Sequence, residues 1–419
     1  MKGLMKVRKS LLISLILVVL LSQCFTAFAA TAPIYEVEYL SNVYQIEISE
    51  DITKGEFEQH LSMALNDDQF LVTEEPLASE KITTLEALSL AIKASNMEEL
   101  ARTYSKEKIN RALKKVNLSF DENNSKISKA EAQDLALALD IELLPASLVP
   151  DFATENLLSQ KEAALILTRT LDLNGCYKNY LGTVMEPTIY GKVLRAIENA
   201  KKVNDEELLT ALDSAIELGL TTGYNIRDTR NNSNFDPVLT IRYGHDNPIH
   251  AIQLIGLLRS EGVNAKVNIE TKTSSYKHMA EWGTDPNPNY EFVPTADGNY
   301  YAHVKEYDIL FEFPTVELKN KFQDIVYQYA IKKEADQPGL IYQAWWQPVF
   351  TSNVELGQYL TMTDNIVKNE VYEAHVYTLN EDSQALVDAL KELDPSLEIS
   401  TEIVWVNVQF YNYLKGEAR

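Results

Sequence analysis

The chain has 419 residues, and its 61 acidic side chains outnumber its 38 lysines and arginines, giving a net charge of −23. So acidic a balance argues against nucleic acid or anionic lipid as a partner, because both bind basic surfaces. The chain has two cysteines, Cys24 and Cys176, and Cys24 lies in a predicted export signal. One remaining thiol cannot form an internal disulfide, so a core must hold the two or three domains that this length allows.

Residues 1–29 are predicted to be a signal peptide. Four basic residues and no acid precede an apolar run at 11–25, and Ala27-Phe28-Ala29 supplies a small-x-small cleavage site. An uncleaved anchor helix would need a longer apolar run, and lipidation of Cys24 would need a small residue in place of Gln23. Cleavage takes the net charge from −23 to −27 and leaves no later segment that could anchor the chain in a membrane.

Residues 30–173 are predicted to be all-helical and repetitive. Four segments share a Ser or Thr, a Glu three residues later and an amphipathic helix, which is the pattern of a capping box. An Ile or Leu precedes each of them and can act as a hydrophobic staple. The four N-cap residues are spaced by 30, 45 and 31 residues, which suggests diverged helical modules with variable loops: Thr53, Thr83, Ser128 and Ser159.

Residues 45–173 resemble the S-layer homology modules of Gram-positive surface proteins. The segment Ser128-Lys129-Ala130-Glu131, after the acidic loop 120–124, is similar to the signature of that family, as is Thr53-Lys54-Gly55-Glu56. The resemblance implies that Lys54 and Lys129 bind an anionic wall polysaccharide at helix starts. The basic residue is replaced at Thr84 and Gln160, so a purely structural helical domain stays open as an alternative.

From about residue 174 the composition shifts toward tyrosine and tryptophan, and strand-like runs appear among helices. Strands are predicted at 265–270, 300–313, 371–379 and 399–411, and helices at 205–218, 248–260 and 383–393. We therefore expect a multidomain chain, with the all-α repeat-like N-terminal domain followed by an α+β C-terminal domain. This second part is divided into an α+β domain at 174–350 and a β-α-β extension at 351–419.

Residues 243–267 resemble the core helix and strand of the transglutaminase-like, papain-related superfamily. Asn247 suits an N-cap, Pro248 the first helical position and Gly262 the left-handed position after the helix. The resemblance implies a catalytic Cys at position 247 and a catalytic His at His303, followed by an acid for which Glu312 is the neighbouring candidate. Asparagine cannot act as that nucleophile, so the resemblance implies a catalytically silent copy. Residues 215–242 also resemble an S-layer homology module, which would extend the repeats instead.

Other candidate sites have a structural interpretation as well. Cys176 lies far from the expected helix start and fits a structural thiol. His245 and His250, with Asp246 between them, are five residues apart rather than the four of a zinc-binding helix pair, which favours an exposed turn. Residues 285–289 begin like a calcium loop but lack its later Gly and Glu. Several aromatics could stack on sugars or a peptide, or could belong to the core: Trp282, Tyr290, Tyr300, Tyr301, Trp345 and Trp346.

The sequence thus predicts a secreted, non-enzymatic protein of a Gram-positive cell surface or wall that binds a wall glycan or an envelope protein. No metal or other cofactor is expected. The alternative is an exported hydrolase or peptidase-like enzyme of the transglutaminase-like superfamily with an unrecognised active site.

Overall fold

The computed structural model describes residues 35–415, apart from 204, 285, 330–349, 356–358, 409–410 and 413–414. The predicted signal peptide and the pair Trp345 and Trp346 lie outside the described residues. The chain divides into two compact units, Met1–Gly175 and Cys176–Arg419. No described helix combines the length and the apolar character that crossing a membrane requires.

The first unit is helical, as predicted. All four predicted capping boxes are confirmed, because at each the N-cap hydroxyl accepts from the N3 amide and the N3 glutamate accepts from the N-cap amide. The boxes begin α3, α4, α7 and α8. The helices of the unit are α2 (Tyr35–Tyr44), α3 (Lys54–Leu65), α4 (Thr84–Ala94), α5 (Glu98–Arg102), α6 (Lys106–Leu113), α7 (Lys129–Asp140) and α8 (Gln160–Leu173).

Two isolated β-bridges, which we call the strip, connect the segments that precede three of these helices. Thr53 pairs with Lys81, and Thr83 pairs with Leu157, in short antiparallel bridges. The staple residues Ile52, Ile82 and Leu158 are each at most 3 % exposed, so the strip sits on the core. The capping boxes therefore fix where α3, α4 and α8 begin relative to one another, in addition to satisfying their free amides.

The second unit is built on one antiparallel sheet. Strands β4, β2, β9, β8, β10, β7, β3 and β6 pair in that order, and β6 pairs again with β4, so eight strands close into a barrel. Strands β1 and β5 add to β4 and β6. The strands are β1 (Gly182–Thr183), β2 (Gly223–Asp228), β3 (Thr240–His245), β4 (Lys266–His278), β5 (Tyr290–Pro294), β6 (Tyr300–Glu312), β7 (Phe350–Ser352), β8 (Leu360–Asn369), β9 (Tyr372–Thr378) and β10 (Glu398–Val406).

The prediction of an α+β second domain is wrong, because this unit is β-rich and centred on the closed sheet. The predicted strands and helices exist, but β1, β2, β3, β5, β7 and β8 were not predicted, and neither were the helices at 189–199 and 316–329. Arg227, Arg242 and Asp364 interrupt the apolar residues of β2, β3 and β8, which hides these three strands from a search for apolar runs. The predicted boundary at residue 350 also falls inside the sheet, since β8, β9 and β10 complete the barrel.

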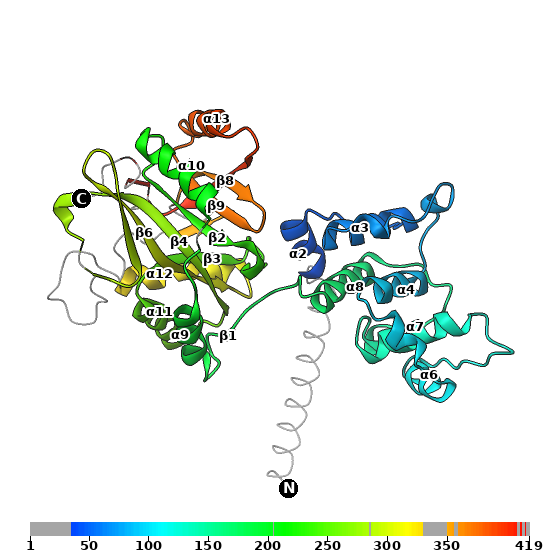
Figure 1. Ribbon diagram of the computed structural model, residues 1–419. Helices are drawn as coiled ribbons and strands as arrows, with labels where there is room; N and C mark the ends of the chain where they lie inside the picture. Colours follow the sequence, from blue (N-terminus) through cyan, green and yellow to red (C-terminus); the bar gives the residue numbers. More distant parts are fainter. Residues whose placement is uncertain are drawn as a thin grey trace, which may run out of the picture. The chain divides into compact units, whose positions relative to one another are not determined.

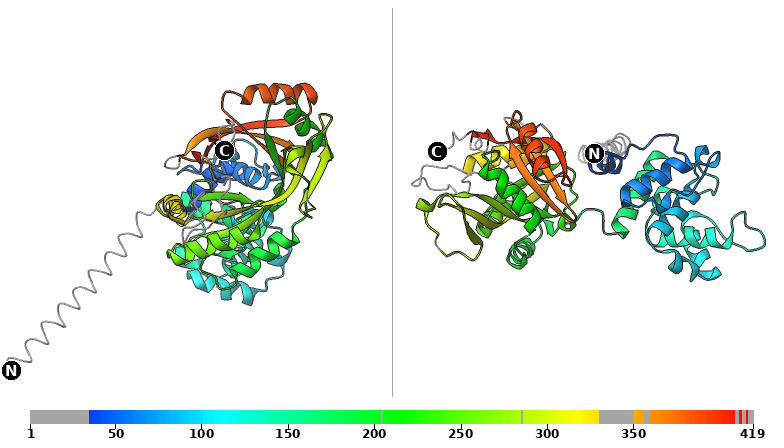
Figure 2. Two further views of the ribbon diagram at one scale, coloured as in Figure 1. Left: turned by 90° about the vertical axis from the view of Figure 1, so that its left-hand side faces the viewer. Right: turned by 45° about the horizontal axis from the view of Figure 1, so that its top comes forward.

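The two larger hydrophobic clusters lie outside the barrel, between its strands and two groups of helices. Helices α9 (Ile189–Asn199), α11 (Pro248–Ser260) and α12 (Val316–Tyr329) cover one side, where their apolar residues meet those of β3, β4 and β6. Helices α10 (Glu206–Glu217) and α13 (Ser383–Leu393) cover β2 and β9. Figure 1 shows the two groups on opposite sides of the sheet, and Figure 2 shows the unit from two other directions. The inward face carries buried charged side chains, together with a smaller apolar cluster of Met362, Tyr377, Val404 and Val406 on β8, β9 and β10.

Candidate functional site

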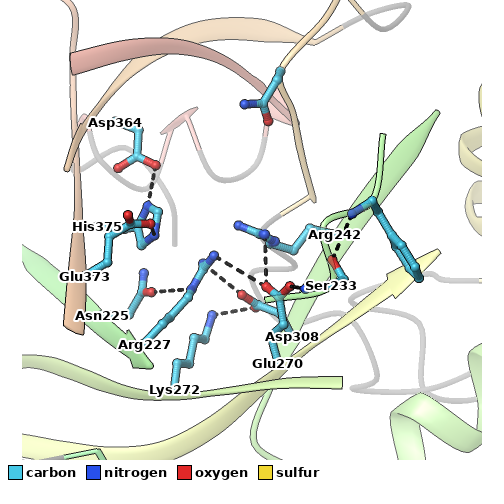
Figure 3. Close-up of polar contacts among 12 residues, drawn as sticks. Asn225, Arg227, Ser233, Arg242, Glu270, Lys272, Asp308, Asp364, Glu373 and His375 are labelled. Carbon is cyan, nitrogen blue, oxygen red and sulfur yellow. Dashed lines mark hydrogen bonds and ion pairs between the residues drawn. The ribbon is translucent and has the colours of Figure 1, made fainter. Parts of the chain in front are cut away.

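The inside of the closed sheet holds a network of buried ion pairs. The Lys272 ammonium on β4 donates to one oxygen of Asp308 on β6 at 2.7 Å, and an Arg227 nitrogen from β2 lies 2.8 Å from the other oxygen. The Arg242 guanidinium on β3 donates to Glu270 on β4 at 3.0 Å. Figure 3 shows these side chains converging from four strands. Alternation along each strand brings them together, because every second residue faces inward.

The network keeps the Asp308 carboxylate ionised although it is buried. Burial opposes ionisation of Asp308, but Lys272 and Arg227 outweigh it and hold the pKa of that carboxyl well below its usual range. On β9, His375 lies 2.7 Å from Asp364 and 2.9 Å from Glu373. Burial acts against the charge on His375, yet the Asp364 carboxylate raises its pKa.

This arrangement orders the barrel around a carboxylate that is almost fully buried. Asp308 is 2 % exposed, so an aqueous solute does not reach it in this structure. A side chain at Gly244 would place its Cβ 2.7 Å from both the Asp308 oxygen and the Lys272 nitrogen, so glycine makes room for the ion pair. A network paired this closely favours the arrangement of strands that brings these charges together.

A pocket of about 450 Å³ lies where β3 ends and α11 begins, and we call it the turn pocket. Its walls come from α9, from the turn itself and from β4 and β6. Three acidic residues and one lysine line it together with apolar side chains. The lining residues are Leu194, Ile197, Glu198, Asp246, Pro248, Thr271, Asn289, Lys305, Glu306 and Tyr307.

The turn is held by a tight set of hydrogen bonds around Asn247. Its side chain accepts from the Ile249 amide at 3.0 Å, which caps α11 as predicted, and Pro248 occupies the first helical turn. The Tyr307 hydroxyl donates to the Asn247 carbonyl at 2.7 Å. The backbone that carries Asp246 into the turn pocket is therefore fixed from both sides.

Two histidines stand beside Asp246. His245 Nδ1 lies 2.9 Å from the Asn247 amide nitrogen and 2.9 Å from an Asp246 oxygen. A neutral ring accepts from the amide there, whereas a charged ring pairs with the carboxylate. His245 Nε2 lies 2.7 Å from His250 Nδ1, and burial together with the neighbouring His245 lowers the pKa of His250 to about 4. Among the described residues, no group of three or more His, Cys, Asp or Glu side chains could hold a metal ion.

The carboxylates of the turn pocket differ in their ionisation. The hydrogen bond with His245 lowers the pKa of Asp246, with burial acting in the opposite direction, so this group is charged at neutral pH. Burial raises the pKa of Glu306, with Lys272 opposing it. The one ammonium group, on Lys305, lies 3.4 Å from the Glu198 carbonyl oxygen. The pocket is thus acidic, and its lining residues include no Cys or Ser that could act as a nucleophile.

The structure does not bring Asn247 and His303 together. His303 Nε2 lies 3.1 Å from an Asp213 oxygen, and the Tyr224 hydroxyl donates to the other Asp213 oxygen at 2.6 Å. Asn247 is instead held by Tyr307, which lies four positions after His303 on β6, or roughly 13 Å along a strand.

The other candidate catalytic residues also have structural partners. Glu312 is buried, and its two oxygens contact the ammonium groups of Lys178 and Lys266. Cys176 is half-buried, and its carbonyl accepts from the Asn234 side chain at 3.0 Å.

The two lysines implied in wall binding differ in their surroundings. The Lys54 ammonium lies 3.2 Å from Glu80 and 3.0 Å from Glu86, so two carboxylates already surround it. Lys129 is more exposed and pairs only at 3.4 Å with Glu122, itself half-exposed. Of the two, Lys129 is the one whose charge remains accessible to an anionic ligand.

Sequence reasoning pointed to Asp246 only as part of a doubtful metal pair, and it missed Glu198 and Glu306. A sequence pattern could have identified Glu306, because Glu306, Asp308 and Glu312 are separated by even numbers of residues in a predicted strand and so share one face of it. No sequence pattern distinguishes Glu198, since a glutamate near a helix end is usually exposed to solvent. Comparison with family models, with curated proteins and with solved structures finds no match to this chain.

Proposed function

We propose that the protein is a non-enzymatic binding protein of the cell envelope, and that its β-rich unit binds a ligand bearing an ammonium group in the turn pocket. The observation that carries the proposal is the lining of the turn pocket, in which the acidic residues Glu198, Asp246 and Glu306 outnumber the one lysine, Lys305, beside apolar side chains. Asp246 is ionised, and in the part of the chain that the structure describes its close partners are His245 and the Tyr290 hydroxyl rather than a guanidinium or ammonium group, which favours a cation from the ligand. The apolar side chains of the pocket would pack against the carbon skeleton beside that cation.

The location rests on the sequence, through the predicted signal peptide and the S-layer homology resemblance of residues 45–173. Attachment to wall polysaccharide through the first unit is part of this proposal, with Lys129 as the accessible cation. An envelope protein is the other partner that the sequence allows.

The test uses two small ligands that differ in charge at the same nitrogen, ethanolamine and N-acetylethanolamine. Ligand-observed NMR at low salt should show binding of ethanolamine alone, and 0.5 M sodium chloride should weaken it, because exposed charges are then screened. The Asp246→Asn variant should lose this binding. Glu381→Gln, which changes an exposed carboxylate before α13, should keep it. Equal binding of the two ligands, or normal binding by Asp246→Asn, would refute the amine site.

A further inference from the structure

A cluster of rings lies at the outer ends of β4, β5 and β6, and we call it the aromatic surface. It consists of His278, Trp282, Tyr290 and Phe292. The ring of His278 stands edge-on to Trp282 at 5.2 Å between centroids and lies 4.8 Å from Phe292, which lies 5.9 Å from Tyr290. Trp282 is 60 % exposed although its neighbours are half-buried. An indole left so far in water at the edge of a ring cluster is typical of a contact site.

The loop that carries Trp282 is held in place before any ligand arrives. Asn299 accepts from the Ala280 amide at 3.1 Å, and a His278 ring nitrogen lies 2.7 Å from the Gly283 carbonyl oxygen. Gly283 itself has φ +77°, the left-handed region that ends the turn. A fixed ring loses little freedom on binding, so its apolar face is available at low entropic cost.

The aromatic surface is continuous with a second cavity and with the turn pocket. Tyr290 and Phe292 help line a cavity of about 300 Å³ together with Thr284 and Asn287, whose side chains can hydrogen-bond a hydroxyl group. The Tyr290 hydroxyl lies 3.4 Å from Asp246 in the turn pocket. One ligand can therefore touch the ring cluster, then amide and hydroxyl groups, and then an ionised carboxylate.

The geometry points to an oligosaccharide that contains an amino sugar as the ligand, with a sugar ring stacked on Trp282 and Phe292 and an unacetylated amino group beside Asp246. The C–H face of a pyranose packs on an aromatic ring, its hydroxyls suit Thr284 and Asn287, and its ammonium group complements the acidic turn pocket. This inference rests on the proposed amine site and adds the class of ligand that the site takes. A proline-rich peptide is the other ligand that such rings accept.

Titration calorimetry of the full chain tests the inference with three probes: a β-1,4-linked glucosamine tetramer, its fully N-acetylated form, and a proline-rich peptide. We expect the glucosamine tetramer to bind more tightly than the acetylated one. Trp282→Ala should weaken binding of the glucosamine tetramer about tenfold, as loss of one stacking contact predicts. Trp282→Phe should restore part of the affinity. Ile403→Ala, which truncates an apolar side chain that is 52 % exposed on β10, should leave it unchanged.

The outcomes separate this inference from the proposed function. If ethanolamine binds but neither tetramer does, the amine site stands and the glycan ligand is wrong. If the glucosamine tetramer binds equally well to wild type, Trp282→Ala and Phe292→Ala, the aromatic surface has no part in recognition. Binding of the proline-rich peptide, lost in Trp282→Ala, would replace the glycan by a protein partner. A loss of ethanolamine binding by wild type would instead refute the proposed function itself.

Discussion

Replacing Asp308 by asparagine should destabilise the second unit more than any exposed charge does. Asp308 is 2 % exposed and lies between Lys272 at 2.7 Å and Arg227 at 2.8 Å. The neutral amide would leave Lys272 with only Glu306, 4.0 Å away, and Arg227 with Glu270, also 4.0 Å away. Removing one partner of a buried ion pair costs about 3–5 kcal/mol, because the remaining charge stays desolvated. We expect a loss in that range.

Urea unfolding followed by tryptophan fluorescence measures this loss directly. All four tryptophans lie after residue 280, so the signal reports the second unit alone. Glu317→Gln is the control, since Glu317 pairs with Lys321 at 3.7 Å on an exposed helix face. Its effect should stay below about 0.5 kcal/mol. A difference of less than about 1 kcal/mol between Asp308→Asn and Glu317→Gln would refute the argument that the inner ion pairs hold the barrel.

A triple variant tests whether the barrel requires the buried charges themselves, or requires only that no buried charge is left without a partner. Replacing Asp308, Lys272 and Arg227 together by leucine, methionine and methionine removes the desolvated charges along with their attraction. Apolar replacement of a buried ion pair or triad is often neutral or stabilising. We therefore expect the triple variant to recover part of the stability that Asp308→Asn loses, because Glu306 loses Lys272, its neighbour at 4.0 Å.

Three further predictions concern other parts of the chain. Burial lowers the pKa of Lys319 to about 8, below the 10.5 of an exposed lysine, so the unfolded chain binds the proton more tightly and stability should rise between pH 8 and 10.5. In chemical denaturation, Lys319→Met should reduce this rise by about half, because Lys178 has a similar pKa of about 8 and keeps its share. Thr83→Ala removes the central capping box and should cost the first unit about 1 kcal/mol in far-UV circular dichroism melts, with Thr83→Ser near wild type. In pull-down by purified cell walls, Lys129→Gln should reduce binding and Lys54→Gln should not, because only Lys54 is enclosed by two carboxylates; the reverse order would contradict the assignment.

The helical unit could be predicted because the residues that specify where each helix begins lie within a few positions of one another in the sequence. A capping box needs a hydroxyl and a glutamate three residues apart, and all four such pairs formed the expected bonds. The same holds for Asn247 and Pro248, which begin α11 as their residue types require. The strip that joins Thr53 to Lys81 and Thr83 to Leu157 was not predictable, since nothing near either residue indicates its distant partner.

The fold class of the second unit was missed because the polar residues at alternate positions of its strands face the interior of the barrel and not the solvent. In most sheets with helices on one face, the polar face of a strand is in water, so charged residues at alternate positions suggest an exposed edge. Here Arg227, Arg242, Lys272 and Asp308 face one another inside a closed sheet, and the apolar face packs outward on helices. The informative signal was that positive and negative side chains occur together: between them, strands β2, β3, β4 and β6 bring both cations and carboxylates to inward-facing positions. A solvent-facing strand does not require such matching, whereas a desolvated interior does, because an unpaired buried charge is too costly to keep.

The turn pocket follows from the same closure of the sheet, since β3, β4 and β6 must be adjacent before Asp246 and Glu306 can line one cavity.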